Sequence, residues 1–155
     1  MTTEFVQIGR WVLRPDVRRT LEAHSKLTAS GATACGCIGC LNFEAVRSRL
    51  LEGPLGSVLE KLGISPPWEV EVYELGRAPS GLHHYGGWFH FVGTIESGAP
   101  ALRSGSADFE QLSSTVSIGF HAAAQLVRPS FKGAPIVQLE VSAELPWVID
   151  AEEPS

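Results

Sequence analysis

Residues 83–95 read His-His-Tyr-Gly-Gly-Trp-Phe-His-Phe-Val-Gly-Thr-Ile, and this stretch decides the fold class. Apolar and aromatic residues occur in it at both odd and even positions. Because successive side chains of a strand point to opposite faces of a sheet, this pattern predicts a central strand that is covered on both faces. Residues 68–73 alternate between apolar and polar instead, which predicts a strand with one solvent-facing side. We expect Glu69 and Glu71 to be solvated on that side rather than to form an acid–base pair.

The N-terminal part of the chain predicts a hairpin. Residues 5–13 are rich in strand formers, and Arg14-Pro15-Asp16 has the composition of a turn. Apolar and polar residues then alternate over residues 17–27, so we expect a second strand that pairs with the first. A helix that stacks Val17 on Leu21 is the alternative.

Two short helices are predicted in the middle of the chain. Asn42 can cap a helix that runs to about Glu52, and a second helix covers residues 55–62 and ends at Gly63. Further elements are expected later in the chain: a helical turn near residues 108–112 and strands around residues 116–126 and 136–145.

These elements together predict the α+β class. The expected architecture is a single domain over residues 1–150, with a largely antiparallel sheet of about six strands and a short helical pair. Residues 151–155 are expected to form an acidic C-terminal tail. At 155 residues, such a domain is long enough to fold on its hydrophobic core alone.

The charge balance restricts the partners. The net charge is −5, and residues 78–155 carry three Lys/Arg against eight Asp/Glu. An acidic half disfavours nucleic acid and anionic membranes, and is compatible with a basic protein partner. The N-terminal residues lack the pattern of a secretory signal, and no run of apolar residues is long enough to cross a membrane, so we expect a cytoplasmic protein.

Cys35, Cys37 and Cys40 are the three cysteines of the chain, and they lie within six residues of one another. This spacing, with glycines between the cysteines, predicts a metal site, and zinc is the expected ion. A helix N-terminus at Cys40 is expected to favour its thiolate. A closed zinc site needs a fourth ligand, for which His24 is the first candidate. The other histidines remain open as alternatives: His83, His84, His90 and His121.

Three other interpretations of the cysteines stay open. Cys37-Ile-Gly-Cys40 before a helix has the arrangement of a redox-active dithiol. The cysteines could equally be reduced residues of a glycine-rich loop without a ligand. A zinc enzyme with an open metal position, and His90 or a carboxylate as the base, is the third interpretation, although three thiolates reduce the Lewis acidity of zinc. The common hydrolase and nucleotide-binding motifs are absent from the sequence.

Three stretches carry a resemblance to known proteins. They are Cys35-x-Cys37-x-x-Cys40-x-Asn42-Phe43, the segment Tyr85-Gly-Gly-Trp-Phe-His-Phe-Val-Gly93, and Leu145-Pro-Trp-Val148. In this combination the chain resembles a group of small bacterial proteins of unknown function, and the resemblance implies that the motif regions are shared hallmarks. Locally, the cysteine spacing is similar to the zinc-binding motif of the glutathione-dependent formaldehyde-activating family. That similarity covers six residues, and the paired zinc sites and lyase chemistry of the family have no counterpart in this chain.

Overall fold

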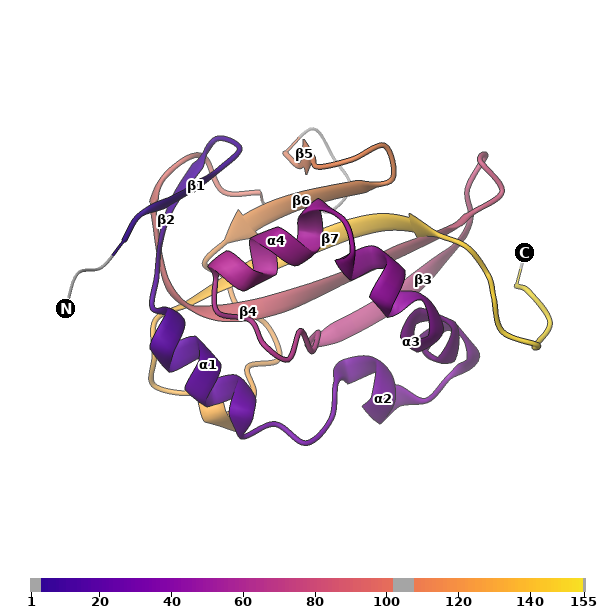
Figure 1. Ribbon diagram of the computed structural model, residues 1–155, viewed down its shortest axis with the longest axis horizontal. Coiled ribbons are helices and arrows are strands. Elements are labelled where there is room, and N and C mark those ends of the chain that lie inside the picture. Colours follow the sequence, from indigo (N-terminus) through magenta and orange to yellow (C-terminus); the bar gives the residue numbers. More distant parts are fainter. Residues whose placement is uncertain (1–3, 102–107, 155) are drawn as a thin grey trace.

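The computed structural model describes residues 4–101 and 108–154 and consists of a mainly antiparallel sheet with four α-helices (Figure 1). In chain order the elements are β1 (Val6–Ile8), β2 (Trp11–Pro15), α1 (Val17–Ser25), α2 (Gly31–Cys35), α3 (Ile38–Leu51), α4 (Pro54–Lys61), β3 (Glu71–Arg77), β4 (His83–Ser97), β5 (Glu110–Gln111), β6 (Val116–His121), the 3₁₀ helix η1 (Pro129–Phe131) and β7 (Ile136–Leu145). The predicted α+β single domain is confirmed.

Strand β4 is the centre of the sheet, as its apolar residues at both parities predict. The strand order is β1-β2-β4-β7-β6-β5, and β3 also pairs with β4. Strand β7 pairs with residues 83–92 of β4, whereas β3 pairs with residues 83–88 and β2 with residues 93–97. Gly86 permits this close packing, because a Cβ atom at that position would lie 2.4 Å from the ring of Tyr73.

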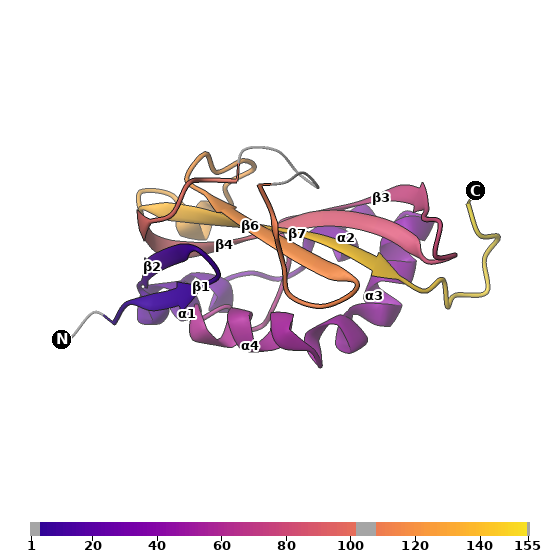
Figure 2. The ribbon, with the colours of Figure 1, turned by 90° about the horizontal axis from the view of Figure 1, so that it is seen from above.

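Helices α3 and α4 lie against one face of the sheet (Figure 2). Their inner residues Phe43, Val46 and Leu59 join the main hydrophobic core, which also holds Phe89 and Phe91 of β4. A smaller cluster of Ala23, Val92 and Phe131 lies between α1, β4 and η1. The two faces of β4 therefore belong to two separate apolar clusters: Phe89 and Phe91 to the main core, and Val92 to the smaller cluster.

The strand predicted over residues 17–27 is wrong, because residues 17–25 form helix α1. Asp16 caps this helix by accepting a hydrogen bond from the Arg19 amide at 3.0 Å. The helix then completes the pairing of β4: the Asp16 amide donates to Val92 O, and the Val92 amide donates to Thr20 Oγ1. The buried side of α1 is thus partly polar, and this is why the apolar pattern misidentifies the element.

Other boundaries also differ from the sequence-based expectations. Helix α3 begins at Ile38 with Cys37 as its N-cap, so Asn42 lies inside the helix and does not cap it. Helix α4 agrees closely with the predicted second helix, and Gly63 follows it with a φ of +79°. Residues 110–111 form strand β5 instead of part of a helical turn, and β6 ends at His121. Among the described residues, no helix is long and apolar enough to cross a membrane.

Two acidic residues have partners that the sequence does not predict. Glu69 is 1% exposed and forms an ion pair with Arg47 at 2.5 Å, so the expectation of a solvated side chain is wrong. In the C-terminal segment, Glu153 forms an ion pair with Arg77 at 2.8 Å and a hydrogen bond with His83 Nε2. At least this part of residues 151–155 is therefore held against the domain.

Candidate metal centre

The three cysteines lie at the junction of two consecutive helices. Cys35 is the last residue of α2, and Gly36 follows it in the left-handed conformation with a φ of +68°. A residue with a side chain would be strained there, whereas glycine allows the chain to reverse within one residue. Cys37 then caps α3, and Cys40 lies in the first turn of that helix. The sharp turn at Gly36 brings the three side chains to one side of the junction.

The three sulfur atoms lie close enough together to bind one metal ion. The three Sγ atoms lie within 4.8 Å of one another, and all three cysteines are free thiols. Sulfur ligands of a tetrahedral zinc ion, with bonds of about 2.3 Å, are separated by about 3.8 Å. A shift of about an ångström or less in the side chains would therefore bring the sulfur atoms to zinc-binding distance.

The three thiols differ in environment. Cys35 and Cys37 are exposed, whereas Cys40 is buried. The Cys40 amide donates a hydrogen bond to Cys37 Sγ at 3.4 Å, and this bond is the main cause that lowers the pKa of Cys37. Burial, followed by the hydrogen bonds with the neighbouring thiols, raises the pKa of Cys40. The favoured thiolate is therefore at Cys37, and the expectation that the helix N-terminus favours it at Cys40 is wrong.

The structure does not bring His24 to this cluster. In the described part of the chain, the group of close potential ligands around the sulfur atoms contains the three cysteines alone. His24 lies in α1 and is fully buried, with Nδ1 at 2.9 Å from Pro66 O and Nε2 at 3.4 Å from His90 O. Burial is also the main cause that lowers its pKa.

The other four histidines have hydrogen-bond partners elsewhere. His83 lies between Glu74 and Glu153, and His84 contacts Ser142. His90 bonds to Gln138 at 3.0 Å. His121 bonds to Glu140. These four histidines lie on β4 and β6, and none belongs to the group of close potential ligands at the junction of α2 and α3.

Asn42 connects this junction to the rest of the molecule, which the sequence alone does not show. Its side-chain amide donates to Tyr85 Oη at 3.2 Å and to Pro146 O at 3.0 Å, and its Oδ1 accepts from the Val148 amide at 2.7 Å. Tyr85 in turn donates to Gly39 O at 2.8 Å. The three stretches that carry the resemblance are therefore neighbours in space, and Asn42 is their common contact.

Two neighbours of Gly39 complete the surroundings of the cysteines. A Cβ atom at Gly39 would lie 3.3 Å from Cβ of Glu74, so the first turn of α3 packs tightly against β3. Burial is the main cause that raises the pKa of Tyr85 to about 12, and the nearby charges of Glu74, Cys40 and Cys37 raise it further. Tyr85 therefore stays protonated at neutral pH and can keep its hydrogen bond to Gly39.

The comparisons with known proteins add no relative to this description. No family model, no curated protein and no solved structure matches the chain. The three-cysteine cluster that could hold a metal ion is therefore the feature on which a function can be based.

Proposed function

We propose that this protein binds one zinc ion through Cys35, Cys37 and Cys40. The observation that carries the proposal is the convergence of three Sγ atoms within 4.8 Å at the junction of α2 and α3. Thiolates select soft and borderline ions, and zinc is the commonest ion in structural sites of this kind. The lowered pKa of Cys37 supports it further, because ligation requires the thiolate.

The proposed site has three protein ligands and one position for a ligand from outside the cluster. Because Cys35 and Cys37 are exposed, a water molecule or a group of a partner protein can reach the metal. His24 is not part of the proposed ligand set. To bind the metal, it would have to leave its buried place and the carbonyl oxygens of Pro66 and His90.

The proposed role of the metal is structural. Three thiolates outweigh the charge of Zn²⁺ and reduce its Lewis acidity, which disfavours activation of a bound water. A metal at this place instead fixes the turn between α2 and α3. Through Asn42 the same junction contacts Tyr85 and the segment after β7, so the metal would stabilise a buried contact between three distant parts of the chain.

Zinc content tests this proposal. Protein purified without chelators is expected to hold about one zinc per chain by elemental analysis, and each single variant Cys35→Ser, Cys37→Ser and Cys40→Ser is expected to lose most of it. Ile38→Ser is the matched control, because Ile38 is an exposed residue of the same junction without a sulfur atom. A zinc content below about 0.2 per chain in the wild-type protein would contradict the proposal.

A thiol–disulfide exchange activity is the second candidate, and the asymmetry of the two thiols favours it. Cys37 is exposed with a lowered pKa, and Cys40 is buried with a raised pKa, as in pairs of attacking and resolving cysteines. In that reaction the Cys37 thiolate attacks a disulfide of a partner. The Cys40 thiol then loses its proton and displaces the mixed disulfide, which leaves a Cys37–Cys40 disulfide and a reduced partner.

Cys35→Ser distinguishes the two candidates. It removes one of three ligands but keeps the Cys37–Cys40 pair, so loss of zinc without loss of disulfide exchange assigns separate roles to the cysteines. If the wild-type protein binds no zinc and catalyses disulfide exchange, the second proposal would replace the first.

A basic protein partner remains a proposal with less support. Among the described acids of residues 78–155, Glu96, Glu110, Glu140 and Glu153 already contact basic or histidine side chains within the chain, and Glu144 accepts a hydrogen bond from Ser80. The acidic surface that is free for a partner is therefore smaller than the sequence implies. A salt-dependent pull-down of a basic protein would support this proposal.

A further inference from the structure

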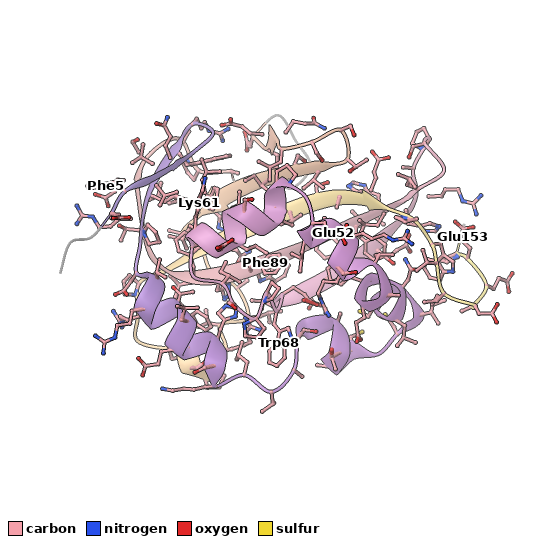
Figure 3. All side chains as sticks on the ribbon, in the orientation of Figure 1. Phe5, Glu52, Lys61, Trp68, Phe89 and Glu153 are labelled. Atoms are coloured by element: carbon pink, nitrogen blue, oxygen red, sulfur yellow. The ribbon has the colours of Figure 1, made fainter. Side chains whose placement is uncertain are left out.

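A groove of about 650 Å³ lies at the end of the molecule opposite to the C-terminal segment, and it is independent of the cysteines. Its lining comes from β2, the first turns of α1, the end of α4 and the middle of β4. Gly63 brings α4 to this place, because its backbone lies so close to Val17 that a Cβ atom would be 2.7 Å from Val17 O. Figure 3 shows Phe5 and Lys61 at this end and Glu153 at the other.

The walls of the groove include apolar side chains that are exposed to solvent. Val17 and Leu21, one helical turn apart on α1, are 38% and 41% exposed, and both line the groove. Val6 and Val92 line it as well. Val17 and Leu21 do not belong to the hydrophobic core, because the buried side of α1 consists of other residues. A concave surface of this size and character is typical of sites for small molecules.

The polar part of the lining is mainly cationic. It contains four basic residues, Arg14, Arg18, Arg19 and Lys61, and two acidic ones, Glu4 and Asp16. Arg14 has an ion pair with Glu96 at 3.6 Å, whereas no ion pair is found for the Arg18, Arg19 or Lys61 side chains within residues 4–101 and 108–154. The described residues of the lining thus carry a net charge of +2, four positive against two negative, in a chain whose net charge is −5.

Two of these cations occupy positions that do not favour helix stability. Arg18 and Arg19 lie in the first turn of α1, which contains no acidic residue. The positive end of the helix dipole disfavours cations there. The Asp16 carboxylate that caps the helix offsets part of this effect, and an anion bound beside Arg18 and Arg19 would offset it further.

We propose that this groove binds a soluble amphipathic anion, a small molecule with a carboxylate or phosphate group on an apolar body. The anionic group would lie beside Arg18 and Arg19, and the apolar body would lie against Val17 and Leu21. Among the described residues that line the groove, none is an aromatic residue on which a base could stack, so a single-stranded nucleic acid fits it less well. Its concave shape fits one small molecule better than a flat lipid surface.

Calorimetric titration with four probes of equal chain length tests the proposal: decanoate, decyl phosphate, decanol and decyltrimethylammonium. At least one of the two anions is expected to bind at least about tenfold more tightly than the neutral and cationic probes, and its affinity is expected to fall as salt rises. Cys35→Ser protein is expected to bind it with unchanged affinity, which separates this site from the proposed metal centre.

The double variant R18E/R19E gives the sharper test. It is expected to weaken binding of the anion at least about tenfold and to keep or raise the melting temperature, because acidic residues suit the first turn of a helix. R49E/K132E changes the net charge equally at exposed positions outside the groove, and is expected to bind like the wild-type protein. A structural role of the arginines alone would move stability and not affinity.

Three results would overturn the proposal. The first is that decanol binds as tightly as both anions. The second is that R18E/R19E binds the anion with full affinity, and the third is that none of the four probes binds. Cosedimentation with vesicles that contain phosphatidylglycerol, without binding of the soluble anions, would assign the surface to a membrane and would equally contradict a soluble ligand.

Discussion

At the scale of single residues, the cysteine cluster could be predicted and its electrostatics could not. Three cysteines within six residues cannot lie far apart, so the cluster follows from spacing alone. Which thiol ionises first depends on burial and on the start of α3, and Cys37 rather than Cys40 is the favoured thiolate. A distant ligand such as His24 depends on the packing of α1, which the local sequence does not reveal.

Asn42 is the residue whose role the sequence conceals most. Asn42→Ala is expected to lower the free energy of unfolding by about 2–4 kcal/mol, because it removes three hydrogen bonds of a buried side chain and leaves the Val148 amide without its acceptor. Urea denaturation measures the change. Ser48→Ala, at an exposed position of the same helix, is the control and is expected to change stability by less than about 0.5 kcal/mol. An equal effect of both variants would contradict this role of Asn42.

At the scale of elements, the sequence predicts the helices and strands in which the spacing of apolar residues matches the buried side. Strands β4 and β7 and helix α4 fall in this class. Helix α1 does not, because its buried residues include Thr20 and His24 while Val17 and Leu21 are exposed. Thr20 and His24 contact backbone groups of β4 that no strand pairs. A pattern of hydrophobicity cannot indicate a helix whose inner side serves as a hydrogen-bonding partner for a strand.

Thr20→Val tests this view of α1. Valine has nearly the shape of threonine but cannot accept the hydrogen bond from the buried Val92 amide, so we expect a loss of about 1–3 kcal/mol in the free energy of unfolding. Thr94→Val, at an exposed position of β4, provides the comparison by the same urea titration. A Thr20→Val protein as stable as the wild type would show that the contact between α1 and β4 does not depend on this bond.

The buried histidines of the same region predict a pH dependence. Burial is the main cause that lowers the pKa of His90 from 6.5 to about 4. Between these values the unfolded chain binds more protons at this site than the folded chain, so the free energy of unfolding falls as the pH decreases through this range. When the pH has fallen below both pKa values, His90 has lowered the free energy of unfolding by about 3 kcal/mol in total.

Urea denaturation from about pH 7 to about pH 4.5 measures this dependence. His90→Gln removes the titrating group and keeps a hydrogen-bonding side chain, so its stability is expected to fall less steeply with decreasing pH than that of the wild type. Parallel curves for the two proteins would show that His90 does not cause the loss.

At the scale of the whole molecule, the charges are arranged unevenly. The chain is acidic overall, and many acids of its second half are bonded within the fold, while the groove beside α1 is cationic. The net charge by itself predicts a basic partner for an acidic surface. The structure shows in addition a groove with a cationic lining. Arg14, Arg18 and Arg19 lie within six residues of the sequence, whereas Lys61 and the groove itself come to them only when the chain around α4 packs beside α1.

The proposed metal centre lies outside the two hydrophobic clusters, except for the buried Cys40. The domain has a core of its own, so zinc is expected to organise one junction rather than to enable folding as a whole. This expectation agrees with the size of the chain, which does not require a metal for stability.

X-ray absorption at the zinc edge of the purified protein tests the central claim most directly, because it counts the sulfur atoms bound to the metal. We predict three sulfur ligands at about 2.3 Å and one nitrogen or oxygen ligand at about 2.0–2.2 Å. A zinc ion with two or fewer sulfur ligands, or with four, would contradict a site formed by Cys35, Cys37 and Cys40 of one chain, and so would protein that holds no zinc.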